Sequence, residues 1–180
     1  MCGDNYRMRK VTYGAACSLD GYIARPNGGV DWLRWSADVQ RLTAAYWTRV
    51  DTVLMGRKTY DAARALGQGA YPSVTNYVFS RTLRESPEPG MHLVRENAAA
   101  FVAQLKGEPG GEICVMGGGQ LAQSLLQADL VDEVGVNIQP VLLGAGIPMF
   151  PGQPGEIRLE LIQAETLEGG CVYALYTVQR

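Results

Sequence analysis

Glycine, hydroxyl and cationic side chains gather at three points where an apolar run gives way to a helical pattern. The clearest is 117–119, three consecutive glycines between the apolar run 112–116 and a helical segment that begins at Gln120. Backbone N–H groups and the helix dipole at such a point favour an anion such as pyrophosphate, and glycine lets the backbone approach it closely. The alternative is a tight turn that needs only small residues. We interpret the segment as an anion-binding turn.

Two further segments carry the side chains that phosphate groups prefer. Residues 56–59 (Gly-Arg-Lys-Thr) follow an apolar run and lead into a helical segment, and residues 80–82 (Ser-Arg-Thr) end the next expected strand. Guanidinium and hydroxyl groups bind phosphate oxygens, although Arg57 and Lys58 could equally be solvated surface charges. Because the carboxyl ends of neighbouring parallel strands share one edge of a sheet, the three segments together predict a site for a dinucleotide with an additional phosphate. The first strand is not followed by the GxGxxG pattern of an ordinary Rossmann enzyme.

Hydrophobic patterning and turn residues give the elements that would position these segments. Expected strands cover residues 10–19, 53–56, 76–80, 91–94, 112–116, 132–143, 157–167 and 171–178. Expected helices start near Ala37 and cover residues 61–66, 98–105 and 120–127, with Asn97 as an N-cap. Gly169-Gly170 predicts a two-residue hairpin. The order predicts an α/β fold: a mostly parallel central sheet with helices on both faces and an antiparallel C-terminal hairpin.

Length and composition narrow the class of protein. The 180 residues suit one domain, which we expect at 9–180 after a loose leader at 1–8. A net charge of -2 gives no electrostatic basis for general nucleic-acid binding, and the polar start has no apolar core of a secretion signal. Four cysteines without a CxxC pair and a single histidine do not predict a metal site. We expect a cytoplasmic protein with no metal and no membrane partner.

Four motifs together resemble a known family. They are residues 16–24 (ACSLDGYIA), 53–60 (VLMGRKTY), 115–120 (VMGGGQ) and 140–150 (PVLLGAGIPMF). In this order they resemble the dihydrofolate reductase-like family, and more narrowly the C-terminal reductase domain of bifunctional riboflavin-biosynthesis enzymes. The resemblance runs from about residue 9 to the C-terminus.

The resemblance implies an NADPH-dependent oxidoreductase. Backbone groups of Ala16 and Ile23 would bind the nicotinamide carboxamide, and Arg57, Ser80 and Arg81 would surround the 2′-phosphate that distinguishes NADPH from NADH. The remaining phosphate ligands would come from the glycine-rich turns. The full expected cofactor set is Ala16, Ile23, Gly56, Arg57, Lys58, Thr59, Ser80, Arg81, Thr82, Gly117, Gly118, Gly119, Gln120 and Leu121.

A proton must reach the acceptor during hydride transfer, which calls for a carboxylate near the substrate. Folate reductases carry an acid on the helix after a tryptophan-containing loop, and Asp38 follows Trp32 in a similar way, with one extra residue. Asp38 is therefore the first catalytic candidate and Asp31 the second, while Trp32 is a candidate substrate contact. Asp38 or Ser36 could instead serve only the helix N-terminus, and Asp20 is expected to make a turn hydrogen bond.

The substrate stays open between several classes. Residues 71–76 contain no basic side chain to receive a folate carboxylate, and no evident basic patch matches a ribosyl phosphate. The sequence is compatible with a reductase of a small heterocyclic or carbonyl substrate, resembling 5-amino-6-(5-phosphoribosylamino)uracil reductase or dihydrofolate reductase. It is also compatible with a non-catalytic NADPH- or nucleotide-binding protein, or with another dinucleotide enzyme. A homodimer through the sheet edge is a further expectation.

Overall fold

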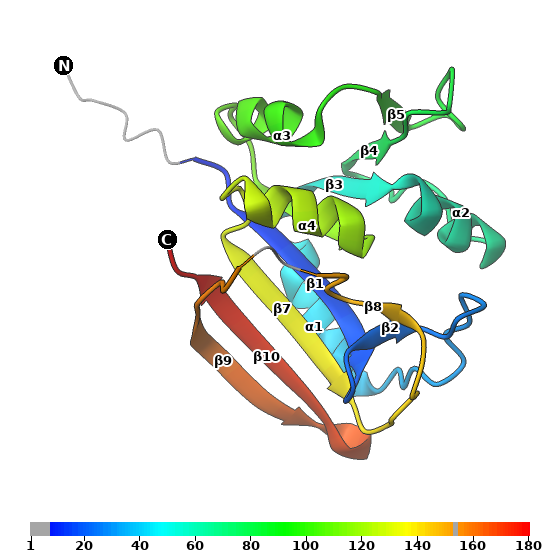
Figure 1. Cartoon of the computed structure of the whole chain (residues 1–180), viewed down its shortest axis with the longest axis vertical. Helices are drawn as coiled ribbons and strands as arrows, with labels where there is room; N and C mark the ends of the chain where they lie inside the picture. The colour runs from blue at the N-terminus through cyan, green and yellow to red at the C-terminus, as the bar shows by residue number, and fades with distance from the viewer. Residues whose placement is uncertain (1–7, 153–154) are drawn as a thin grey trace.

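The computed structural model describes residues 8–152 and 155–180. Eight strands form one sheet in the order β5-β4-β3-β6-β1-β7-β10-β9 (Figure 1). The first six strands in this order run parallel, whereas β10 is antiparallel to both of its neighbours, β7 and β9. A short pair, β2 with β8, lies beside the end of β1. The strands are β1 Val11–Ser18, β2 Tyr22–Ala24, β3 Val50–Gly56, β4 Thr75–Phe79, β5 Met91–Val94, β6 Glu112–Gly117, β7 Glu133–Gln139, β8 Ile147–Pro148, β9 Leu159–Leu167 and β10 Cys171–Val178.

Helices cover both faces of the sheet, as the sequence predicts. They are α1 Ala37–Trp47, α2 Arg57–Ala65, α3 Ala98–Lys106 and α4 Gly119–Gln127. Side chains of α3 and α4 pack with alternate residues of β1 and β6 in the largest core cluster, while α1 and α2 pack with the opposite face of β3 and β6. The parallel strands are apolar on both faces because both faces are buried. None of the helices in the described part of the chain is long and apolar enough to cross a lipid bilayer.

Most element boundaries agree with the patterning, and the exceptions have physical reasons. The second helix was expected from Asp61 but begins at Arg57, because the chain turns into the helix directly at the end of β3. The seventh strand ends at Gln139 rather than Leu143, since Pro140 cannot donate to a ladder. The last two strands are joined by a three-residue 3₁₀ turn, Glu168–Gly170, rather than a two-residue hairpin.

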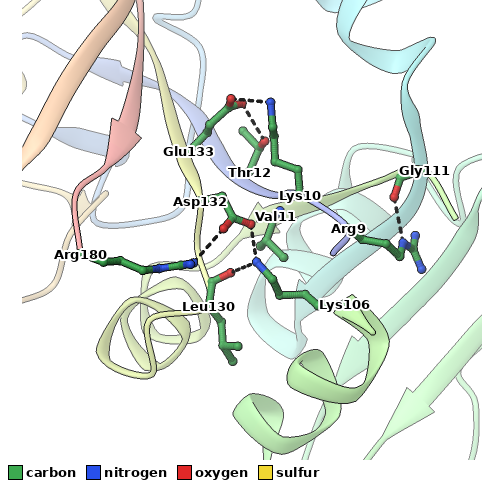
Figure 2. A network of polar contacts seen from close by, with 10 residues as sticks. All are labelled: Arg9, Lys10, Val11, Thr12, Lys106, Gly111, Leu130, Asp132, Glu133 and Arg180. Atoms are coloured by element: carbon green, nitrogen blue, oxygen red, sulfur yellow. Dashed lines mark hydrogen bonds and ion pairs between the residues drawn. The ribbon is translucent and has the colours of Figure 1, made fainter. Parts of the chain in front are cut away.

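The amino ends of the strands are joined by charged side chains (Figure 2). The ammonium group of Lys106, 4% exposed, donates to the carboxylate of Asp132 and to the carbonyl oxygen of Leu130. Arg180 binds the other oxygen of Asp132 at 2.8 Å, and Lys10 binds Glu133 at 2.6 Å. These contacts connect α3, β7, β1 and the C-terminus at the edge of the sheet opposite to the glycine-rich turns.

Candidate functional site

The three predicted phosphate-binding segments lie on one edge of the sheet. Strands β4, β3, β6 and β1 are parallel neighbours, so their carboxyl ends meet there. The connection after β3 leads outward to β4, whereas the connection after β6 crosses β1 to reach β7. The two connections therefore diverge between β3 and β6. Ligands of open α/β sheets bind in the crevice at such a switch point.

At this switch point the turns after β3 and β6 touch each other. A Cβ atom placed on Gly56 would lie 3.5 Å from the backbone nitrogen of Gly118, and one placed on Gly118 would lie 3.1 Å from Oγ1 of Thr59. The two turns are separated by 60 residues in the sequence and pack directly together in the fold.

Two helices begin in this contact region without side-chain caps. Gly56 is the N-cap of α2 and Gly118 the N-cap of α4, and neither has a side chain that could accept a hydrogen bond from the first N–H groups of its helix. By contrast, Ser36 caps α1 through Val39 N at 3.3 Å, and Asn97 caps α3 through Ala100 N at 3.1 Å, as predicted. The first N–H groups of α2 and α4 are thus left for another acceptor. Two adjacent helix N-termini suit the two phosphates of a diphosphate.

The three glycines after β6 have different surroundings. Gly117 has φ +130, a conformation that favours glycine, and Gly118 faces the hydroxyl of Thr59. Gly119 is buried, and a Cβ there would lie 2.8 Å from Cδ of Pro151 and 2.9 Å from the carbonyl oxygen of Met149. Gly117 and Gly119 therefore serve the turn and its packing, while Gly118 is the position whose missing side chain leaves access to the helix start.

Next to this turn, β1 separates from β6. The two strands pair only from Val11 to Tyr13 on β1, whereas β1 remains paired with β7 as far as Ser18. The carbonyl of Lys10 accepts from β6 and that of Val11 from the β7 side, and backbone direction alternates along a strand. The N–H and C=O of Ala16 consequently point to the side from which β6 has diverged. The backbone groups of Ala16 are thus left unpaired by β6, and their role in binding a carboxamide stays a prediction.

The third segment, 80–82, places a cation at the end of β4. The hydroxyl of Ser80 is 7% exposed and accepts from the backbone of Thr82 and Leu83, so it shapes the turn. Arg81 is exposed and has no ion-pair partner within residues 8–152 and 155–180. Arg57 is held by Asp61 at 2.7 Å on the outer side of α2. Arg81 is therefore the more available guanidinium.

The remaining expected cofactor residues differ in exposure. Lys58 and Gln120 are exposed at the starts of α2 and α4, whereas the side chain of Leu121 is buried in the core and only its backbone can face a ligand. Ile23 is half-buried and packs against the main core cluster. Its strand, β2, follows directly from the carboxyl end of β1.

The loop after β1 is fixed by contacts that sequence patterning indicated only in part. Asp20 accepts from the hydroxyl of Ser18 at 2.6 Å, as a turn residue should, and also from the backbone of Leu143 and Gly144 at 3.1 and 2.7 Å. These hydrogen bonds hold the pKa of the Asp20 carboxyl below its usual range, the contact with Ser18 contributing most. Asp20 thereby joins the loop after β1 to the segment 141–151, which follows β7.

The predicted proton-handling carboxylates already have partners in the protein. Asp38 accepts from the backbone N–H of Glu168 at 3.1 Å and lies 3.6 Å from Arg41. Asp31 forms two hydrogen bonds with Arg25, at 2.8 and 2.9 Å, and these lower the pKa of its carboxyl. Both carboxylates are thus engaged by groups of the protein, and it is Ser36 rather than Asp38 that caps α1. Their catalytic role stays a prediction.

Trp32 retains an unusual feature in the structure. Its indole Nε1 is buried and has no hydrogen-bond partner among the described residues. A buried donor without a partner costs about 1–3 kcal/mol, so a ligand group that accepts from it would bind favourably. Its assignment as a substrate contact stays a prediction.

Known proteins are similar to this chain in sequence and in fold. Residues 9–173 match the family model of the RibD C-terminal domain. The "Uncharacterized protein YwjB" of Bacillus subtilis (strain 168) is 35% identical over 85% of this chain and 89% of its own length. Among solved structures, a "Putative riboflavin biosynthesis protein" from Shewanella sp. PV-4 has a TM-score of 0.84 at 29% identity, covering 95% of this chain and 99% of that one.

A dihydrofolate reductase shares the fold at lower identity. The enzyme from Enterococcus faecalis, complexed with NADP(H) and RAB-propyl, has a TM-score of 0.71 at 16% identity, over 95% of this chain and 97% of that one. The match to the family model spans nearly the whole described chain, and a curated relative exceeds 30% identity. The chain therefore belongs to the RibD C-terminal domain family, a reductase-like family with the dihydrofolate reductase-like fold.

Proposed function

We propose that this protein is an NADPH-dependent reductase of a small heterocyclic or carbonyl substrate. The observation that carries the proposal is the contact between two uncapped helix N-termini, those of α2 and α4, at the switch point of the sheet. Support comes from the Enterococcus faecalis dihydrofolate reductase, whose structure of the same fold was determined with NADP(H). The alternative is a nucleotide-binding protein that keeps the fold without catalysing a reaction.

In this proposal each segment binds one part of the cofactor. The N–H groups at the start of α4 and the Gly56–Thr59 turn hold the phosphates that join the two nucleotides. Arg81, with Thr82 and Ser80 beside it, binds the 2′-phosphate. Ala16 binds the nicotinamide carboxamide through the backbone groups that face the separation of β1 from β6.

The bound NADPH would supply a hydride, which adds to the carbon of a C=N or C=O group while the nitrogen or oxygen gains a proton and NADP⁺ is left. The residues of this chain bind and orient the two reactants. Asp38 and Asp31 are the carboxylates proposed to hold the proton, and Trp32 is the proposed substrate contact.

The first experiment measures cofactor binding and then turnover. NADPH is titrated into the protein while tryptophan fluorescence is recorded, and NADPH oxidation is then followed with dihydrofolate and with 5-amino-6-(5-phosphoribosylamino)uracil. Saturable quenching with oxidation of NADPH by either substrate is the expected result. Quenching without oxidation would favour the non-catalytic alternative, and the absence of saturable quenching would overturn cofactor binding itself.

A second experiment tests the choice of NADPH over NADH. Replacing Arg81 with alanine removes a charge-assisted contact worth about 1.5–3 kcal/mol, so NADPH affinity should fall about 10–100-fold while NADH affinity changes little. Arg158→Ala is the matched control, because Arg158 is 82% exposed and pairs with Glu156 next to β9, far along the sheet order from β4. An equal loss for both cofactors would contradict the assignment of Arg81.

We further propose a homodimer formed through β9. This strand lies at the end of the sheet, and within the described residues no strand pairs with its outer edge. Leu159, Leu161 and Ile162 are 43%, 54% and 50% exposed on it. Long edge strands with exposed apolar residues are usually covered, and a second copy of the same strand can pair with it antiparallel.

A further inference from the structure

The face of the sheet that packs against α1 contains an open area beside Ala16. Gly14 on β1 lies opposite Gly135 on β7, so this part of the sheet has no side chains. A Cβ placed on Gly14 would meet only the carbonyl oxygen of Gly135, at 3.4 Å, and no atom of α1 within 4 Å. Gly14 and Ala16 are also partly exposed, although β1 is a central strand. Gly14 therefore forms the floor of an open area between α1 and the sheet.

Two polar side chains border this floor. The strand register places Ala16 opposite Asn137, and Asn137 opposite Tyr173, in one row across β1, β7 and β10. Residues opposite one another in a sheet have their side chains on the same face. Tyr173 packs with the α1 residues Val39 and Leu42, which identifies this face as the one covered by α1.

The side chain of Tyr173 covers Gly135, next to this floor. A Cβ placed on Gly135 would lie 3.5 Å from the Tyr173 hydroxyl oxygen and 3.6 Å from Cδ1 of Leu175. That hydroxyl has no hydrogen-bond partner among the described residues, and neither has Nδ2 of Asn137. The Asn137 carbonyl oxygen accepts from Nε2 of Gln139 at 3.2 Å, which fixes the direction of the amide. Two half-buried polar groups that lack partners therefore face the same space.

We infer that Asn137 and Tyr173 bind the polar edge of the hydride acceptor, whose flat ring or carbonyl group lies over Gly14. This inference rests on the proposed function, because it takes the nicotinamide to lie beside Ala16. An amide nitrogen donates and a phenol both donates and accepts, so the pair suits the carbonyl and ring-nitrogen atoms of a planar heterocycle. Glycine at position 14 leaves room for a planar ring, whereas a larger side chain at this position would occupy the same space.

The test compares acceptor binding with cofactor binding in the same variants. Asn137→Leu keeps the size of the side chain without its amide, Tyr173→Phe removes only the hydroxyl, and Gly14→Val fills the floor. Tyr176→Phe is the matched control, because Tyr176 lies on β10 opposite Val134 and on the other face of the sheet. The probes are NADP⁺ by titration calorimetry, and folate and 5-amino-6-(ribosylamino)uracil by ¹⁵N NMR, each with and without saturating NADP⁺.

The inference predicts a separation of the two affinities. At least one heterocyclic probe should bind to the NADP⁺-loaded protein and shift the side-chain amide signals of Asn137. Its affinity should fall about tenfold or more in Asn137→Leu and Gly14→Val, and several-fold in Tyr173→Phe. Affinity for NADP⁺ should stay within about twofold in every variant, and Tyr176→Phe should behave as the unmodified protein in both measurements.

Each other outcome has a distinct meaning. Binding of NADP⁺ without binding of either probe would overturn this inference and leave the cofactor assignment intact. Equal probe affinity in the unmodified protein and in Asn137→Leu and Gly14→Val would also overturn it. Failure of the unmodified protein to bind NADP⁺ would overturn the proposed function first, and this inference with it.

Discussion

The three glycines after β6 are identical in sequence, but their contacts separate a packing role from a binding role. Gly119 lies against the backbone of the segment 148–151, where no side chain fits. Gly118 has φ -89, a value open to any residue, and its nearest neighbour is the end of the Thr59 side chain. The sequence alone cannot distinguish these environments, because glycine has no side chain whose chemistry would indicate its neighbours.

This difference gives a prediction for two alanine variants. In Gly119→Ala the new Cβ must displace backbone atoms, so the free energy of unfolding should fall by about 1–3 kcal/mol, as in other overpacked sites. In Gly118→Ala the weaker helix cap and the smaller entropy of the unfolded chain oppose each other, each by up to about 1 kcal/mol, so stability should change little. Urea unfolding followed by circular dichroism measures both.

The two variants should show the opposite order in their effects on NADPH affinity. The Cβ of Gly118→Ala would stand at the start of α4, where we propose that a phosphate approaches the backbone, so NADPH affinity should fall about tenfold or more. Fluorescence titration checks this. If Gly118→Ala bound NADPH as the unmodified protein does, the turn would be a packing device only, which is the alternative that the sequence left open.

At the scale of helices and strands, the N-termini of the four helices divide into two kinds. Ser36 and Asn97 satisfy the first turns of α1 and α3, whereas α2 and α4 begin at glycine. Capping side chains lower the free energy of a helix end by about 1 kcal/mol, so leaving two ends uncapped is a cost unless another group binds there. The two uncapped helices are those that start at the switch point.

The start of α1 allows a test of Asp38. Its carboxylate accepts from Glu168 N and so connects α1 to the turn between β9 and β10. Because Asp38 is the first carboxylate proposed to hold the proton, we expect Asp38→Asn to lower turnover about 100-fold or more and to shift its pH profile, with NADPH affinity little changed. Glu156→Gln is the control, because Glu156 is exposed and pairs with Arg158 outside the proposed site.

The contrary result is equally specific. Unchanged turnover and an unchanged pH profile in Asp38→Asn would contradict its proposed role and leave only the hydrogen bond from Glu168 N. The measurement is the initial rate of NADPH oxidation between pH 5 and 9 with whichever substrate the protein accepts.

For the molecule as a whole, the carboxyl and amino ends of the strands have different roles. The carboxyl ends hold the proposed site, and the amino ends are held together by ion pairs (Figure 2). Lys106 reaches Leu130 O at 3.0 Å and the carboxylate of Asp132, which in turn binds Arg180. A buried ammonium group is stable only where such partners surround it. The pair thus fixes α3 and the C-terminal residue to the start of β7.

Replacing Lys106 with methionine should show the strength of this connection. The change keeps the length of the side chain and leaves the carboxylate of Asp132 with fewer donors, so the free energy of unfolding should fall by about 1–3 kcal/mol. Arg158→Met removes an exposed ion pair and should change it by less than about 0.5 kcal/mol. Equal effects in both variants, measured by urea unfolding, would contradict the structural role of Lys106.

The proposed dimer is also a property of the whole molecule. We expect twice the monomer mass at micromolar concentration in light scattering after size-exclusion chromatography. Leu161→Lys combined with Ile162→Lys should give a monomer, because lysine on an edge strand opposes pairing. Leu142→Lys is the control, since Leu142 is 69% exposed in the loop after β7. A monomer mass for the unmodified protein would refute the proposed homodimer.

Much of the fold could be predicted because it rests on local patterns. The apolar runs of β3 and β6 mark strands that are buried on both faces, and Asn97 marks the start of α3. The short pair β2 with β8 could not be predicted, because two or three residues carry no period and pair only when distant segments meet. The contact of Gly119 with Met149 escaped prediction for the same reason.

The candidate site, like the fold, could be predicted from the sequence only in part. Glycine, arginine and hydroxyl residues at strand ends were enough to predict a phosphate-binding edge, because the chemistry of phosphate recognition depends on residue type. The row of Ala16, Asn137 and Tyr173 was not predicted, because side chains from three strands become neighbours only through the register of the sheet.

By itself, the sequence determined most of the segments that become strands and helices and indicated which turns to propose as anion sites, since both depend on residues close together in the chain. Tertiary structure alone decided that β1 separates from β6, that two uncapped helices meet, and that the carboxylates of Asp31 and Asp38 are engaged by other groups. These features depend on contacts across many residues, whose geometry follows from the packing of the whole sheet and not from any one segment.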